Sequence, residues 1–348
     1  MERESVSRMT EQATALERAG DWEGASEVYT RAFAAAVEAR DLTAAADALR
    51  GSGRSRRFQG RYEEAEEYAE LSWEIAERNG LSQAAGRALN MLAAIHYLRG
   101  DHRTARTLYE RALEQARNAG DDDLIGFICQ NLGVIANIQG NLRDARALYL
   151  ESIGASVRAE NPSSSTAAYN NLGLVCSDLQ EWMEAEIYFA RGIEIAERIS
   201  SAPLLARLCA NRAEPLLQVQ EFARAKETLA RAEAVASRIH DVGPLADVAR
   251  FRGMAARLEG DLDAAEEHLV RSVGLATSAG LELERAEALR ELAHLRRAQG
   301  RVEDAVSVMF QAREIFRSLG AEYDVARVEE LAARWREDAP SAAADPVR

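Results

Sequence analysis

The sequence has few of the residues that sheets, membrane spans and secretion signals require. Aromatic residues make up only 6 % of its 348 residues, whereas hydrophobic residues make up 47 % and alanine is abundant. This composition favours closely packed helices over sheets. No run of 18 or more apolar residues occurs, so we expect no membrane span. The start, MERESVSRMTEQ, lacks the apolar core of a signal peptide, which predicts a cytoplasmic protein.

Cysteine and lysine are also scarce. The three cysteines, Cys129, Cys176 and Cys209, form no C-x-x-C pair and lie in apolar stretches, so we interpret them as small buried hydrophobic residues. One lysine stands against 42 arginines, which we attribute to genomic base composition. The net charge of −14 argues against general binding to nucleic acid or to anionic membranes.

Motifs for catalysis and for metal binding are missing as well. The five histidines form no H-E-x-x-H pair, no G-x-S-x-G elbow occurs, and no cysteine has a histidine at catalytic spacing. The many glutamates, as in EEAEEYAE, fall on the expected outer faces of helices, where solvation is the default. We therefore predict a protein that is not an enzyme and that uses no metal and no cofactor.

What the sequence does contain is a repeat of forty residues. Glycine recurs at this spacing, and glutamine takes two of the positions: Gly20, Gly60, Gly100, Gly140, Gln180, Gln220, Gly260 and Gly300. Alanine stands five residues after each of them: Ala25, Ala65, Ala105, Ala145, Ala185, Ala225, Ala265 and Ala305. Two further columns, which begin at Ala13 and Ala32, hold only small residues. Small residues at fixed positions let helix backbones approach closely.

The apolar spacing within each repeat is that of paired amphipathic helices. Apolar residues recur every three or four residues, as in ARTLYERALEQA, and two helices of about 17 residues fit each period. Glycines such as Gly120 fall where second helices should end, and Pro162, Pro203 and Pro244 fall near the starts of first helices. The pattern predicts repeats at about 3–40, 41–80, 81–120, 121–160, 161–200, 201–240, 241–280 and 281–320, a capping helix at 322–337 and a disordered tail at 338–348.

These columns, together with a G-[DR]-[WY]-x-x-A turn, resemble the tetratricopeptide repeat (TPR) over nearly the whole chain. The familiar repeat has 34 residues, and this one is similar to the lengthened variety of kinesin light chains, Pins-type adaptors and bacterial Rap-type peptide receptors. The resemblance implies an all-α fold, a right-handed superhelical solenoid of eight helix-turn-helix repeats that forms a single domain over residues 1–337. In this family the first helix of each repeat lines a concave groove.

Groove-facing side chains recur at positions i, i+4 and i+7 of each first helix, and we name these positions the stripe. Three stripes are rich in arginine: Arg50, Arg54 and Arg57; Arg250, Met254 and Arg257; Arg290, His294 and Arg297. Three others are neutral: Asn90, Ala94 and Tyr97; Gln130, Val134 and Asn137; Asn170, Leu174 and Ser177. Two interpretations stay open. The arginines are solvated or paired with glutamates of neighbouring helices, or they bind an acidic motif of a partner.

Asparagine follows the first stripe residue in three successive repeats, at Asn131, Asn171 and Asn211. In TPR proteins an asparagine at this place often hydrogen-bonds the main chain of an extended peptide, because an amide both donates and accepts. The resemblance thus implies an asparagine ladder, and the alternative is ordinary polar residues at a helix edge. The candidate peptide-binding residues are Arg50, Arg54, Arg57, Asn90, Asn131, Asn171, Asn211, Arg250, Arg257, Arg290 and Arg297. Glu214 and Val134 do not match the carboxylate clamp of chaperone-binding TPRs.

Two local irregularities carry further expectations. The stretch LRGSGRSRRFQG is not a phosphate-binding loop, because it has neither the lysine nor the preceding strand of one. Within it, Gly51 has no counterpart in the other repeats and is expected to weaken its helix by about 1 kcal/mol relative to alanine. Pro215 lies inside a first helix and predicts a kink there, which is either tolerated or used as a hinge.

The favoured function is a non-enzymatic scaffold or adaptor that binds a peptide segment of a partner protein in its concave groove, including segments with acidic motifs. The alternative is a bacterial signalling regulator that senses a peptide or small ligand and acts on a partner protein. Direct binding of nucleic acid is disfavoured, because aromatic residues beside the arginines are sparse and the net charge is negative. The sequence leaves the oligomeric state open.

Overall fold

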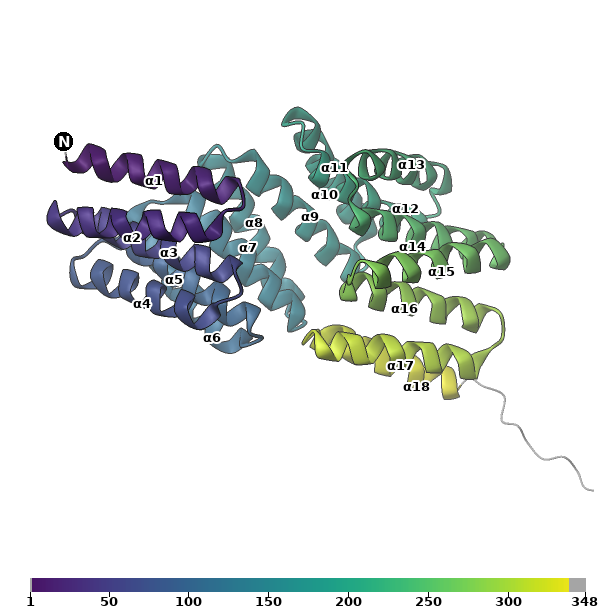
Figure 1. The fold of residues 1–348 in the computed structure, drawn as a ribbon. Helices are drawn as coiled ribbons and strands as arrows, with labels where there is room; N and C mark the ends of the chain where they lie inside the picture. Colours follow the sequence, from purple (N-terminus) through teal and green to yellow (C-terminus); the bar gives the residue numbers. More distant parts are fainter. Residues whose placement is uncertain (1, 338–348) are drawn as a thin grey trace, which may run out of the picture. The chain divides into compact units, whose positions relative to one another are not determined.

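The computed structural model describes residues 2–337, and helices account for almost all of this part of the chain, without a strand (Figure 1). The predicted all-α repeat array is confirmed. None of the described helices is both long and apolar enough to cross a membrane. The helices are α1 (Glu2–Arg18), α2 (Trp22–Glu38), α3 (Leu42–Phe58), α4 (Tyr62–Arg78), α5 (Ser82–Leu98), α6 (His102–Ala119), α7 (Asp122–Ile138), α8 (Leu142–Arg158), α9 (Pro162–Asp178), α10 (Trp182–Arg198), α11 (Ala202–Asn211), α12 (Ala213–Gln218), α13 (Phe222–Ile239), α14 (Val242–Glu259), α15 (Leu262–Ser278), α16 (Glu282–Ala298), α17 (Val302–Ser318) and α18 (Glu322–Glu337).

The chain divides into two compact units. Unit 1 is formed by Met1–Ile135 and Gly154–Asn161, and unit 2 by Ala136–Ile153 and Pro162–Arg348. Within each unit, helices that follow one another pair as hairpins, such as α5 with α6 in unit 1 and α14 with α15 in unit 2 (Figure 1). That residues 1–337 form a single solenoid stays a prediction, and the expected disordered tail at 338–348 lies outside the described residues.

The forty-residue columns form the interior of these hairpins. All eight alanines that stand five residues after the turn are fully buried. The small-residue columns leave room for large side chains of the paired helix: a Cβ built on Gly173 of α9 would lie 2.6 Å from the ring of Phe189 on α10, which is fully buried. One sequence-based expectation was wrong in its reasoning. Gly51 has a structural role, because a Cβ there would lie 2.5 Å from the ring of Tyr29.

The turns between paired helices share one conformation whether or not glycine is present. Gly60, Gly100 and Gly260 have φ values of 76°, 81° and 89°, in the left-handed region. Gln180 and Gln220, which replace glycine in two repeats, have φ values of 60° and 62°. The backbone hydrogen bonds persist there, since the Gln180 amide donates to the Ser177 carbonyl at 2.9 Å. Tertiary packing therefore imposes a conformation that a side chain with a Cβ disfavours.

We expect Gln180→Gly to raise the free energy of unfolding by about 0.5–1 kcal/mol, because glycine adopts the left-handed region without the Cβ clash and Gln180 is exposed. Chemical denaturation followed by circular dichroism measures the change. The reverse substitution, Gly260→Gln, is the matched control and should lower stability by a similar amount. Equal stabilities of Gln180→Gly and wild type would show that the turn carries no strain.

The predicted kink at Pro215 is present. The first helix of the sixth repeat is interrupted at Arg212, which separates α11 from α12. Proline has no amide hydrogen to donate to the carbonyl of the residue four positions earlier, here Asn211, and its ring clashes with that turn. The helix therefore breaks about one turn before the proline, and Ala213 begins a short new segment that belongs to unit 2.

Candidate peptide-binding face

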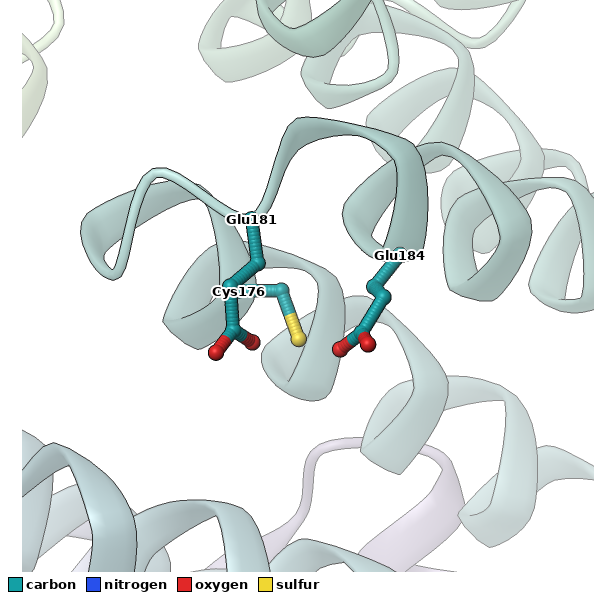
Figure 2. Close-up of side chains that lie close together, drawn as sticks. All are labelled: Cys176, Glu181 and Glu184. Carbon is teal, nitrogen blue, oxygen red and sulfur yellow. The ribbon is translucent and has the colours of Figure 1, made fainter.

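One cluster in unit 2 contains residue types that can bind a metal ion, but its carboxylates are already paired with an arginine. Ligand atoms of Cys176, Glu181 and Glu184 lie within 4.8 Å of one another, at the end of α9 and the start of α10 (Figure 2). The Arg146 guanidinium already contacts both carboxylates, at 2.6 Å and 2.5 Å. Burial raises the pKa of the Cys176 thiol to about 12, so it stays protonated at neutral pH. We therefore interpret the cluster as an ion-paired helix contact, and the expectation that no metal is used stays a prediction.

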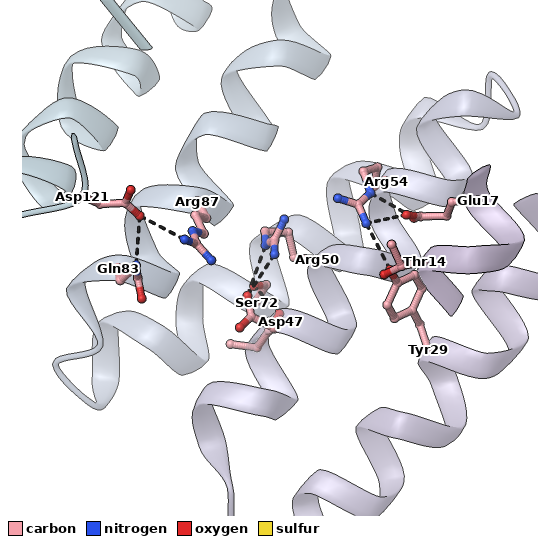
Figure 3. Close-up of polar contacts among 11 residues, drawn as sticks. Thr14, Glu17, Tyr29, Asp47, Arg50, Arg54, Ser72, Gln83, Arg87 and Asp121 are labelled. Atoms are coloured by element: carbon pink, nitrogen blue, oxygen red, sulfur yellow. Dashed lines mark hydrogen bonds and ion pairs between the residues drawn. The ribbon is translucent and has the colours of Figure 1, made fainter. Parts of the chain in front are cut away.

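The first two stripe arginines of unit 1 are engaged by carboxylates (Figure 3). Arg54 donates to both oxygens of Glu17, at 2.9 Å and 2.5 Å, and to the Tyr29 hydroxyl at 3.0 Å. Arg50 donates to Asp47 on its own helix at 3.0 Å. The contacts of Arg54 join α3 to α1 and α2, whereas the contact of Arg50 lies within α3. Both guanidinium groups are thereby held in position. Both arginines thus have an acidic partner within unit 1, as the first interpretation expects, and binding of a partner protein by them stays a prediction.

Arg57, the third stripe arginine of α3, differs from the other two. Its side chain is half-buried, its guanidinium carbon lies 4.6 Å from the centre of the Phe58 ring, and its Nε is buried with no hydrogen-bond partner. Burial lowers the pKa of Arg57, with the like charge of Arg54 acting in the same direction. Arg57 is thus a cation that the described residues solvate poorly.

The stripe arginines of unit 2 lie in a network of ion pairs. Arg250 of α14 is 5 % exposed and contacts Asp247 at 2.9 Å and Glu287 of α16 at 2.8 Å. Arg257 contacts Glu291 of α16 at 3.2 Å. The last two candidates are both on α16: Arg290 contacts Asp324 of α18 at 3.0 Å, and Arg297 is half-buried. Arg250, Arg257 and Arg290 are therefore not free to bind an acidic ligand without giving up a carboxylate.

The asparagine candidates do not form one uniform ladder. In unit 2, Asn211 donates to the Asn170 side chain at 2.9 Å, and Asn170 donates to Asn171 at 3.4 Å. Asn211 is buried, so its amide is committed to this cluster. In unit 1, Asn131 is half-buried, and the Oδ1 atom of Asn90 is buried without a hydrogen-bond partner.

A family comparison agrees with this arrangement of helices. The model described as tetratricopeptide repeat matches residues 85–156, which span part of α5, all of α6 and α7 and most of α8. This match supports the tetratricopeptide-repeat resemblance over these residues, about a fifth of the chain. The alanine column that contributed to this resemblance is the one that the hairpins bury completely.

Three solved structures are similar to this chain. BtubC (BKLC) from P. vanneervenii is 22 % identical, with a TM-score of 0.53 and with 63 % of this chain and 92 % of that chain covered. The apo form of the quorum sensor NprR from B. thuringiensis is 15 % identical, with a TM-score of 0.65 and coverage of 88 % and 86 %. The Rap conjugation gene regulator of plasmid pLS20 in complex with the Phr* peptide is 14 % identical, with a TM-score of 0.58 and coverage of 84 % and 77 %. None of the curated proteins matches the sequence.

Buried polar atoms without a hydrogen-bond partner are concentrated on the stripes of this chain. Among the described residues, eleven buried side-chain nitrogen or oxygen atoms lack a hydrogen bond within the chain. Six of them are on stripe residues: Arg57 and Asn90 in unit 1, and Asn137, Ser177, Arg250 and Arg257 in unit 2. Buried polar groups in folded proteins are nearly always paired, so an orphaned group requires an explanation. Hydrogen bonds to a ligand would supply one.

Sequence reasoning missed the acidic half of the unit 2 network. Asp178 at the end of α9 contacts Arg327 of α18 at 2.8 Å, across 149 positions of sequence. Neither residue is on a stripe, and no periodic signal marks them. Burial raises the pKa of Asp178 to about 6 and that of Glu214 to about 7, although nearby arginines oppose both shifts. The hint in the sequence was Glu214, an acidic residue at stripe position i+4 of the sixth repeat.

Proposed function

We propose that this chain is a non-enzymatic interaction scaffold of the cytoplasm, which binds an extended peptide segment of a partner protein along the stripes of its first helices. The observation that carries the proposal is the concentration of orphaned buried polar atoms on the stripes. A peptide main chain offers one donor and one acceptor per residue, which suits Asn137 Oδ1 and Ser177 Oγ. The similar structure solved with the Phr* peptide supports a peptide as ligand.

The chemistry of the two units differs, and the ligand should differ accordingly. In unit 1 we assign acidic residues of the peptide to Arg57, the stripe arginine without a carboxylate contact there. In unit 2 the paired arginines leave no such cation at Arg250, Arg257 or Arg290. Main-chain contacts to Asn137, Asn171 and Ser177 are the proposed interactions of that unit.

The test begins with selection of binding sequences from a displayed library of random heptapeptides. The affinity of a selected synthetic peptide is then measured by calorimetry for wild type and for Asn137→Ala/Ser177→Ala. We expect a loss of about 10-fold or more if the peptide lies on unit 2, because each lost hydrogen bond contributes about 0.5–1.5 kcal/mol. Gln311→Ala, at an exposed position of α17, is the control and should bind as wild type does. Unchanged affinity in both variants would remove the unit 2 stripe from the binding site.

A second candidate function, a ligand sensor that acts on a partner protein, is supported by two features. The helix break at Arg212 offers a place for unit 2 to bend, and one side-chain contact, Asp178 with Arg327, links α9 to the last helix. The similar fold of the quorum sensor NprR is consistent with this function. Small-angle scattering with and without the selected peptide tests it, and an unchanged radius of gyration would count against a sensor.

A further inference from the structure

The carboxylate of Glu214 has no ion-pair partner among the described residues, although it lies in a part of unit 2 that is rich in charged side chains. Glu214 is the second residue of the short segment α12 and is half-buried, and no hydrogen bond or ion pair among the described residues holds it. Charged groups of three other helices act on it: Asp178 from α9, Arg250 from α14, and Glu287 and Arg290 from α16. Every one of these four neighbours has an ion-pair partner, whereas Glu214 has none.

The charges around Glu214 do not balance. The ion pairs among these helices use four guanidinium groups, those of Arg250, Arg257, Arg290 and Arg327. Six carboxylates lie in the same network, Asp178, Glu214, Asp247, Glu287, Glu291 and Asp324. With all six carboxylates ionised, the network has two negative charges in excess. Burying unpaired carboxylates costs free energy, and a cation placed among them would offset that cost.

Two buried polar groups beside the carboxylates also lack a partner. Ser177, adjacent to Asp178 on α9, is 6 % exposed, and its Oγ has no hydrogen bond. Arg250 extends into the network, where it contacts Asp247 and Glu287, yet its Nε is buried without an acceptor. Ser177 and Arg250 are on the stripes of the fifth and seventh repeats, and Glu214 has the corresponding position i+4 in the sixth repeat between them. A ligand that brought a cation to Glu214 could therefore also accept or donate hydrogen bonds through its main chain at these groups.

We propose that unit 2 binds a cationic group of the peptide ligand, with the Glu214 carboxylate as its direct partner and Asp178 and Glu287 completing the anionic surroundings. This inference rests on the proposed peptide-binding function and specifies its ligand: a segment that carries arginine, lysine or a free α-amino group. It differs from the acidic motif expected from the sequence, because the arginines that motivated that expectation are neutralised in this unit. An ammonium or guanidinium group can pair with Glu214, the carboxylate of this network that has no ion pair among the described residues.

The test uses the heptapeptide library on the full chain, with wild type and Glu214→Gln selected in parallel. We expect arginine or lysine to be enriched several-fold at one position by wild type and not by the variant. The selected peptide should bind Glu214→Gln at least 10-fold more weakly. Binding to wild type at pH 7 should release protons, detected by calorimetry in buffers of different ionisation enthalpy, whereas binding to the variant should not. Glu194→Gln, on the exposed side of α10, is the matched control.

Each outcome decides a different question. Enrichment of basic residues that depends on Glu214 supports the inference. If the selected peptide still binds after N-acetylation, the cation is a side chain. If N-acetylation abolishes binding, the cation is the α-amino group. Peptides selected without a basic preference, and bound equally by wild type and Glu214→Gln, would overturn the cation site but leave the scaffold function intact. No selected peptide from either protein would overturn the peptide-binding function itself. Misfolding does not confuse these outcomes, because glutamine has the shape of glutamate and carries no charge to desolvate.

Discussion

Glu214→Gln is expected to raise the free energy of unfolding by about 2 kcal/mol at pH 7.5 in the absence of ligand. Burial raises the pKa of Glu214 from 4.5 to about 7, with Asp178 and Glu287 raising it further and Arg250 and Arg290 lowering it. A rise of that size corresponds to about 3 kcal/mol of destabilisation when the group is ionised. Solvent contact with the half-buried side chain reduces the expected effect to about 2 kcal/mol. Glutamine removes the charge and keeps the shape.

The pH dependence gives the sign of this prediction. Because the pKa of Glu214 is higher in the folded chain than its ordinary value of 4.5, the folded state binds more protons between pH 4.5 and about 7. Wild type should therefore lose stability relative to Glu214→Gln as the pH rises through that window. Below about pH 4.5 the two proteins should be equally stable. Denaturation at a series of pH values measures the difference.

A control separates Glu214 from the other titrating carboxylates. Burial also raises the pKa values of Asp178 and Asp247 to about 6, and both groups remain in the variant, so their contribution largely cancels in the comparison. Loss of the Glu214 charge should lower the pKa of Asp178, which carbon-detected magnetic resonance can follow. If the stability difference between the two proteins did not change with pH, ionisation of Glu214 would not destabilise the folded state. The excess of negative charge around Glu214 would then not be supported.

Gly173→Ala is expected to lower the free energy of unfolding by about 1–3 kcal/mol, although helix propensity alone predicts a gain of about 1 kcal/mol. The added Cβ would lie 2.6 Å, 2.7 Å and 2.8 Å from Cε1, Cζ and Cδ1 of Phe189. The ring is fully buried, so it can move only by displacing the packing between α9 and α10. Chemical denaturation of the single variant gives the magnitude.

Two further variants make that prediction specific. Gly274→Ala, on the exposed side of α15 with nothing within 4 Å of the new Cβ, should raise stability by about 1 kcal/mol. Gly173→Ala/Phe189→Leu should recover part of the loss, because leucine is less bulky at the point of contact. Should Gly173→Ala and Gly274→Ala both stabilise the protein, the small-residue column would not be needed for close approach of the helices.

The repeat period, the helix ends and the interior of the hairpins could be predicted from the sequence. Local chemistry dictates them: small residues at fixed spacing permit close packing, and residues after the turn start each helix at a bulky position such as Trp22 or Trp182. Pro215 likewise acts locally, since a missing amide hydrogen breaks a helix in any surroundings. The repeat columns therefore indicated the resemblance to the family, and Pro215 predicted a kink in its helix, which the structure places at Arg212.

The chemistry of the stripes was decided by the tertiary structure alone. Whether Arg250 and Arg290 are free cations depends on Glu287 and Asp324, which stand 37 and 34 positions further along the chain and come beside them only when the helices stack. Asp178 contacts Arg327, which is 149 positions away in the sequence, and no repeat signal marks either residue. The packing role of Gly51 could not be predicted from the repeat either, because the ring of Tyr29 that requires a glycine there lies on another helix. Periodicity describes what each repeat shares, whereas charge balance and contacts between helices depend on the particular residues that stacking brings together.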